Sequence, residues 1–124
     1  MEKLYSKSHE WVEMIDETTA IVGISDYAQK MLGGLVFVGL PEVGDGVTVG
    51  ESFADVESVK AVSDIYSPVT GTVAEVNEEL LDAPELINED ADKAWFVKIE
   101  GITEKEELME QKEYDEFCLT EGLE

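Results

Sequence analysis

The chain has 124 residues, with 30 acidic side chains against 8 lysines and no arginine, so its formal net charge is −22 at pH 7. This balance argues against nucleic acid and anionic membrane surfaces as partners, because phosphate groups would be repelled and no guanidinium is present to bind them. It favours partners with basic faces, although the same charge also serves simply to keep a small protein soluble. Hydrophobic residues make up 44% of the chain, enough for one modest core, and we expect a single domain over residues 1–124.

The first quarter of the chain predicts two strands and a helix. Residues 5–12 and 18–24 mix β-branched, aromatic and polar side chains, which is typical of half-buried strands. Ser25 is a favourable N-cap, so residues 26–32 predict a short helix, and the glycine pair that follows ends it.

The centre of the chain predicts a hairpin with one lysine at its tip. Residues 52–56 and 63–67 both read as half-buried strands, and Lys60 lies midway between them. Such a hairpin would present the Lys60 ammonium group between the side chains of Val59 and Ala61. By geometry alone, a lysine at a hairpin tip is more often a solvated turn residue than a functional one.

The other segments predict further short strands and a helical C-terminus. The apolar run 35–38 has no period and indicates a strand buried on both faces. Residues 69–73 predict a second tight turn, and residues 95–99 predict the last strand. Thr103 and Glu106 form a capping box, so we expect helices over 104–109 and 112–119. Many short strands and few helices indicate a mainly β sandwich or barrel.

No catalytic or metal-binding group is apparent in the sequence. His9 is the single histidine and Cys118 the single cysteine. A serine triad needs an imidazole beside a serine, and zinc needs three or four nitrogen or sulfur ligands, so we expect neither. The protein is therefore predicted not to be an enzyme, and its chemistry must come from an attached group.

The residues around Lys60 resemble the lipoyl-attachment segment of the glycine cleavage system H-protein family. The resemblance rests first on residues 56–61 and 63–71. It extends in the same order over five further segments that together span nearly the whole chain: Ser8–Trp11, Gly23–Gln29, Val36–Gly44, Val76–Glu78 and Pro84–Asn88. It implies the barrel-sandwich hybrid of lipoyl and biotinyl domains, a flattened barrel of two antiparallel sheets. Short helices are then expected near 26–32 and 104–119, with the segment 103–119 packed on the single lipoyl-carrier domain.

The resemblance also implies a cofactor and partners. Lipoic acid would be joined to Lys60 as an amide by a lipoate ligase or lipoyl transferase that recognises Glu57, Ser58, Val59 and Ala61. The arm would take an aminomethyl group from glycine decarboxylase, a pyridoxal-phosphate enzyme, to aminomethyltransferase. It would pass electrons to dihydrolipoamide dehydrogenase. The expected compartment is the cytoplasm, or the mitochondrial matrix for a processed eukaryotic form.

The resemblance further implies a surface cleft that shelters the loaded arm, with Glu10 and Asp64 as its acids. Four residues depart from the usual pattern and affect how this cleft and the docking faces form: Met31, Gly34, Gly39 and Ala94. Three alternatives stay open from the sequence. They are an H-like lipoyl donor, relay or redox carrier in another pathway, a biotin carrier, and an unmodified interaction module.

Overall fold

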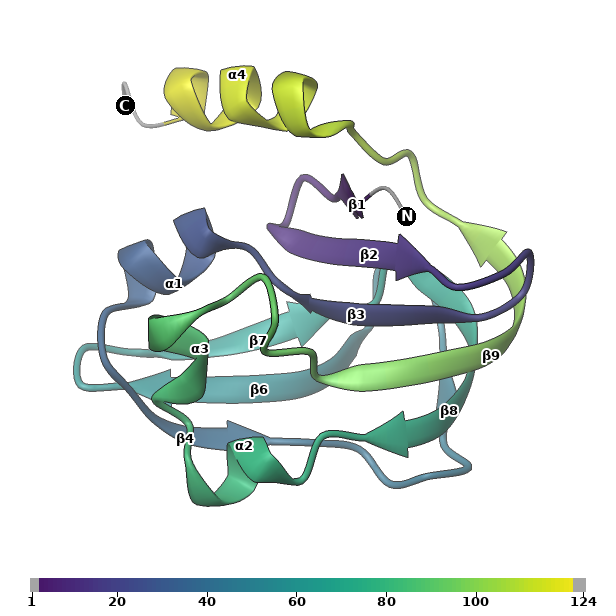
Figure 1. Cartoon of the computed structure of the whole chain (residues 1–124), viewed down its shortest axis with the longest axis horizontal. Helices are drawn as coiled ribbons and strands as arrows, with labels where there is room; N and C mark the ends of the chain where they lie inside the picture. Colours follow the sequence, from purple (N-terminus) through teal and green to yellow (C-terminus); the bar gives the residue numbers. More distant parts are fainter. Residues whose placement is uncertain (1–2, 122–124) are drawn as a thin grey trace.

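The computed structural model describes residues 3–121, which form nine strands and four short helices (Figure 1). The strands are β1 (Lys3–Tyr5), β2 (Glu10–Met14), β3 (Ala20–Ile24), β4 (Leu35–Gly39), β5 (Gly46–Val47), β6 (Ser52–Ser58), β7 (Val62–Tyr66), β8 (Val69–Val76) and β9 (Val97–Lys105). The helices are α1 (Asp26–Leu32), α2 (Glu79–Asp82), α3 (Leu86–Glu89) and α4 (Gln111–Glu121). Residues 1–2 and 122–124 of the predicted 1–124 domain lie outside the described residues.

The strands form two antiparallel sheets. The larger sheet has six strands in the order β1-β2-β3-β9-β8-β5, and the smaller has three in the order β4-β6-β7. The predicted mainly β fold with two antiparallel sheets is thereby confirmed. The two sheets enclose the main core, to which both contribute fully buried valines, Val22 and Val73 from the larger sheet and Val56 from the smaller. Burying one such side chain stabilises the fold by about 1.5–3 kcal/mol.

Helix α1 forms where the sequence predicts it. The Ser25 side chain accepts a hydrogen bond from the backbone N–H of Ala28, which satisfies one of the otherwise unpaired donors of the first turn. Gly33 ends the helix with φ at 84°, a conformation that favours glycine. The chain then turns directly into β4.

The prediction that residues 35–38 are buried on both faces is wrong. Leu35 and Val38 are buried, but Val36 is 58% exposed and Phe37 is 47% exposed. The outer face of the smaller sheet does not pack on the core, and a shift in the pairing register between Leu35 and Phe37 breaks the alternation of faces, so Val36 and Phe37 are both exposed. An apolar run without a period can therefore also belong to a strand with an uncovered face.

Two predictions for the second half of the chain are also wrong. Residues 69–73 are not a turn but the first part of the long strand β8, which pairs with β5 on one side and β9 on the other. Residues 104–105 end β9 instead of starting a helix, and Met109 forms an isolated bridge with Tyr5. In both places, pairing with distant strands outweighs the local turn and capping signals.

The last helix, α4, begins at Gln111 and lies against the β1 side of the larger sheet (Figure 1). It seals a second apolar cluster formed by Tyr5, Trp11, Met109 and Tyr114. The rings of Tyr5 and Tyr114 stack with centroids 4.4 Å apart. The helix predicted over 112–119 is therefore present, slightly longer at both ends, and it packs on the barrel.

Candidate functional site

The hairpin tip is a tight turn that Ser58 closes. The backbone N–H of Ser58 donates to the carbonyl oxygen of Ala61 at 2.8 Å. The Ser58 hydroxyl accepts hydrogen bonds from the backbone N–H groups of Lys60 and Ala61, each at 3.1 Å. Ser58, for which the resemblance implies recognition by the lipoylating enzyme, thus fixes the backbone that carries Lys60.

Lys60 is exposed at this tip, and no ion pair between described residues holds its amine. The connection from α1 to β4 supports the tip from one side, because the N–H of Val59 donates to the carbonyl oxygen of Gly34 at 3.2 Å. A Cβ at Gly33 would lie 3.3 Å from Cε of Lys60, so the absence of a side chain leaves room for the lysine stem. The backbone is therefore braced while the amine stays accessible.

A cavity of about 190 Å³ lies beside the hairpin, between α1, β7 and the turn that joins β1 to β2. It is lined by Ser8, His9, Ile24, Tyr27, Ala28, Met31, Leu32, Ser63, Asp64 and Ile65. The predicted cleft residue Asp64 is among them and is exposed. Met31, one of the departures from the family pattern, also lines the cavity and is 64% exposed. We refer to this cavity as the arm cleft.

The second predicted acid, Glu10, is not among the lining residues and is only 1% exposed. Its carboxylate accepts a hydrogen bond from the hydroxyl of Ser6 at 2.8 Å and another from that of Ser8, which does line the cleft. The N–H of Tyr66 donates to its other oxygen at 3.4 Å. Burial raises the pKa of Glu10 to about 7, although these hydrogen bonds lower it in part. Glu10 thus lies behind the cleft wall and holds the wall residue Ser8 by a hydrogen bond.

Tyr114 on α4 joins the two walls of the arm cleft. Its hydroxyl forms a hydrogen bond with Nδ1 of His9 at 2.8 Å and another with the hydroxyl of Ser25 at 2.5 Å. His9 lines the cleft with φ at 75°, and Ser25 caps the helix that forms the opposite wall. Burial raises the pKa of the Tyr114 hydroxyl, so it stays a neutral donor and acceptor. The sequence predicted Tyr114 only as one residue of the helix over 112–119.

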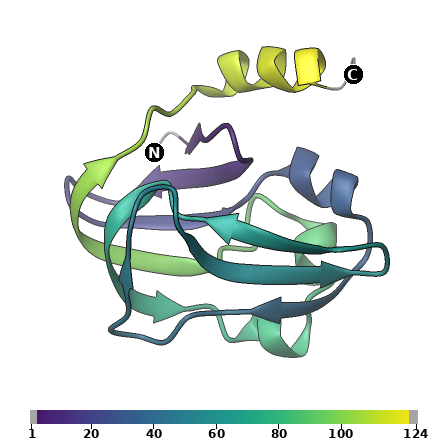
Figure 2. The same cartoon turned by 180° about the vertical axis from the view of Figure 1, so that it is seen from behind.

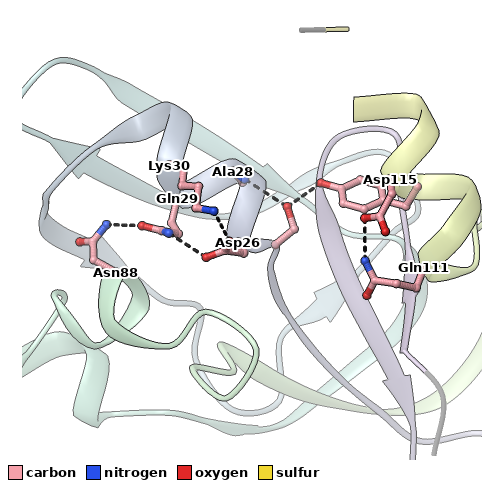
Figure 3. A network of polar contacts seen from close by, with 9 residues as sticks. Asp26, Ala28, Gln29, Lys30, Asn88, Gln111 and Asp115 are labelled. Carbon is pink, nitrogen blue, oxygen red and sulfur yellow. Dashed lines mark hydrogen bonds and ion pairs between the residues drawn. The ribbon is translucent and has the colours of Figure 1, made fainter. Parts of the chain in front are cut away.

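Asn88 on α3 fixes the connection that braces the tip. Its amide donates to the side chain of Gln29 at 2.8 Å and to the carbonyl oxygen of Gly33 at 2.9 Å. Its oxygen accepts from the N–H of Leu35 at 2.9 Å. Figure 3 shows this side chain reaching α1, where Asp26 and Lys30 form an ion pair at 2.9 Å. From the sequence, Asn88 was only the last residue of the family-like segment Pro84–Asn88, with no role indicated for its side chain.

The other departures from the family pattern lie at separate places. A Cβ at Gly34 would meet nothing within 4 Å, whereas a Cβ at Gly39 would collide with the carboxylate of Asp55. Ala94 is 6% exposed and belongs to the main core.

Within residues 3–121, no group of three or more histidine, cysteine, aspartate or glutamate side chains could hold a metal ion. No helix of this described part is long and apolar enough to cross a membrane.

The fold and the site together define a class of protein. It is a small β protein that presents one accessible lysine on a braced hairpin beside a cleft. A family model described as "Glycine cleavage H-protein" matches residues 3–121. The chain belongs to the glycine cleavage H-protein family, whose members are the lipoyl carriers of the glycine cleavage system.

Individual proteins agree with this assignment. The glycine cleavage system H protein of Lachnoclostridium phytofermentans is 64% identical over 118 residues, covering 95% of this chain and 93% of that protein. The H protein of Alkaliphilus oremlandii is 56% identical, covering 96% of this chain and 94% of its own length. The crystal structure of a glycine cleavage system H protein from Mycobacterium marinum matches with a TM-score of 0.85 and 36% identity, covering 98% of this chain and 97% of that one.

Proposed function

We propose that Lys60 carries the lipoyl group as an amide on its Nζ atom, and that residues 1–124 act as one lipoyl-carrier domain. The observation that carries this proposal is the exposed amine on a backbone braced by Ser58, Val59 and the α1–β4 connection. The site fits such a group, because the lysine stem passes a glycine and the arm cleft opens beside the same hairpin. A tethered arm raises the local concentration of its reactive end without tight binding.

When attached, the lipoyl group supplies a disulfide that can accept an aminomethyl group together with two electrons and later release both. The chain itself shelters the end of the arm. Asp64 places a carboxylate at the cleft wall, where a cationic amine would be attracted. Glu10 orients Ser8 from behind that wall, and the apolar side chains of Ile24 and Leu32 help to exclude water.

The partners that follow are those of the glycine cleavage cycle. We infer that glycine decarboxylase, aminomethyltransferase and dihydrolipoamide dehydrogenase each act on the arm in turn. A lipoate ligase or lipoyl transferase would attach the arm, with Glu57, Val59 and Ala61 offered beside Lys60. The protein is then a substrate of these enzymes in the cytoplasm, and not a catalyst.

A Lys60→Arg variant tests this proposal. We expect it to fold with less than about 1 kcal/mol loss of stability, because the side chain is exposed, and to carry no lipoyl group. Intact and peptide masses of the protein from its own host measure the modification, and thermal unfolding measures the fold. Lys93→Arg changes another exposed lysine and should leave lipoylation intact. A lipoyl amide on a residue other than Lys60 would refute the assignment.

A further inference from the structure

One face of the β4-β6-β7 sheet points away from the core and carries apolar side chains beside Lys60. Directly opposed residues of antiparallel strands share a face, and Phe37, Glu57 and Val62 form one such row across the three strands. Phe37 is 47% exposed and Val62 is 66% exposed. Figure 2 shows β6 and β7 in front, with no helix lying across them. We call this the outer sheet face, formed by Phe37, Asp55, Glu57, Val62, Asp64 and Tyr66.

Exposed apolar side chains are concentrated around this face. Ten large hydrophobic side chains are exposed in the described part of the chain. Six of them lie on α1, β4 or the β6–β7 hairpin, namely Met31, Val36, Phe37, Val59, Val62 and Tyr66. The other four are scattered over distant segments, as is normal on a protein surface. A cluster of this kind marks an interaction site more often than single exposed residues do.

Carboxylates border the apolar row. Asp55 and Asp64 are directly opposed in the next row of the same face. Gly39, which pairs with Asp55, has no side chain, and the Asp55 carboxylate lies over the position that a Cβ would take. No ion pair between described residues involves Asp55, Glu57 or Asp64. The outer sheet face therefore offers an apolar row beside uncompensated negative charge.

We propose that the outer sheet face is the docking surface of the enzyme that acylates Lys60, and that this enzyme meets it with an apolar centre rimmed by lysine or arginine. The inference rests on the proposed attachment at Lys60. Any such enzyme must cover the tip to reach Nζ, and the α1–β4 connection already occupies one side through Val59 and Gly34. The outer sheet face is the uncovered surface continuous with the tip, and its charge suits a basic rim.

Docking on this face would precede an acyl transfer to Lys60. Nζ of Lys60 attacks the carboxyl carbon of lipoate activated as an acyl adenylate. The amine loses a proton as the amide bond forms, and AMP leaves with the electron pair of the broken bond. The outer sheet face takes no part in this chemistry and only positions the two proteins.

The first test compares apolar truncations in matched pairs. Val62→Ala removes a valine that is 66% exposed on the outer sheet face, and Val43→Ala removes one that is 62% exposed elsewhere. Phe37→Ala and Leu81→Ala form a second pair. Apo protein is acylated by the purified lipoylating enzyme of the same host, and intact mass gives the rate. We expect kcat/KM to fall at least about fivefold for Val62→Ala and Phe37→Ala, and less than about twofold for the controls.

The second test concerns charge. Asp55→Asn should lower kcat/KM at low ionic strength and make kcat/KM depend less on salt. The variant loses the attraction between Asp55 and the basic rim of the enzyme, which salt screens in the wild-type protein. Glu100→Gln removes an exposed carboxylate from β9 and should change neither quantity. Thermal unfolding of every variant checks that the fold is kept, and Val62→Ala keeps the test valid if Phe37→Ala does not fold.

The outcomes separate the two proposals. If wild-type protein is not acylated on Lys60, the proposed attachment fails. If wild-type protein is acylated and Val62→Ala behaves as Val43→Ala does, the docking proposal is overturned and the attachment stands. It is also overturned if the defect appears only in the reaction with glycine decarboxylase. Loss of a dimer in sedimentation of Val62→Ala, with unchanged acylation, would overturn it in favour of a second copy of the chain.

Discussion

At the scale of single residues, Glu10 differs from the other described acids because its carboxylate is buried. It lies 1% exposed at the start of β2, whereas Asp64 is exposed at the cleft wall. Two serine hydroxyls and the N–H of Tyr66 on the other sheet hydrogen-bond to it. These bonds offset only part of the desolvation of its charge, so its pKa is raised from 4.5 to about 7.

The raised pKa predicts that stability falls as the pH rises. The folded protein binds the Glu10 proton more tightly than the unfolded chain does. The contribution of this proton to the free energy of unfolding is therefore complete below pH 4.5 and is lost as the pH rises through about 7. One pKa unit corresponds to about 1.4 kcal/mol, so the loss between these values is about 3 kcal/mol. Glu10→Gln stays neutral and should remove this dependence, which makes it more stable than wild type at pH 8.5.

Urea denaturation at pH 5.5, 7 and 8.5 measures this effect as the free energy of unfolding. Asp64→Asn is the control, because it neutralises an exposed carboxylate in the same region and should leave the wild-type pH dependence in place. Equal pH dependence in wild type and Glu10→Gln would show that Glu10 does not titrate in this range in the folded protein.

At the scale of elements, α4 holds the arm cleft together through Tyr114. A Tyr114→Phe variant removes the hydrogen bonds to His9 and Ser25 and should lower the free energy of unfolding by about 1–3 kcal/mol. We also expect faster amide hydrogen exchange in the first turn of α1, because Ser25 caps that turn.

Tyr5→Phe provides the matched control. Tyr5 stacks on Tyr114, but its hydroxyl binds Gln111 at 2.7 Å and reaches no residue of the arm cleft. Tyr5→Phe should lose this hydrogen bond to Gln111 without changing amide hydrogen exchange in the first turn of α1. Equal exchange in both variants would mean that α4 stabilises the barrel without controlling the cleft.

The elements also show what the sequence could and could not predict. The hairpin around Lys60 and helix α1 depend on neighbouring residues, such as Ser58 for the turn and Ser25 for the cap, so local patterns predicted them. The false helix over 104–109 arose from an equally good local signal, which lost to pairing of β9 with β8. A capping box indicates a helix only where no sheet competes for the same backbone groups.

The parts of the site that escaped prediction rely on contacts between distant residues. Tyr66 lies 56 residues from Glu10, and Tyr114 lies 105 residues from His9. No periodicity in a single sequence encodes which tyrosine meets His9, because the packing of α4 on the larger sheet brings the two side chains together. The place of Lys60 at a hairpin tip could be predicted because that hairpin is local, whereas the role of Lys60 and the arm cleft could be expected only through the resemblance.

At the scale of the whole molecule, the net charge of −22 opposes folding. Ion pairs between described residues engage Asp92, Asp26 and Glu75, and 8 lysines are too few to neutralise 30 acids in any arrangement. Compaction brings these charges closer together, so self-repulsion destabilises the folded state. The same negative field would attract a partner with a basic surface, so one property of the sequence would both weaken the fold and speed such an encounter.

Salt should therefore stabilise this protein at neutral pH. Raising NaCl from about 0.01 M to 1 M shortens the Debye length from about 30 Å to about 3 Å and screens the repulsion. We expect Tm at pH 7.5 to rise by at least about 4 °C, which corresponds to about 1 kcal/mol for a domain near this size. The same salt step at pH 4.1, the isoelectric point of the sequence, should change Tm much less, because little net charge remains to be screened. An equal rise at both pH values would assign the stabilisation to a general effect of salt on apolar burial and not to the charge of the chain.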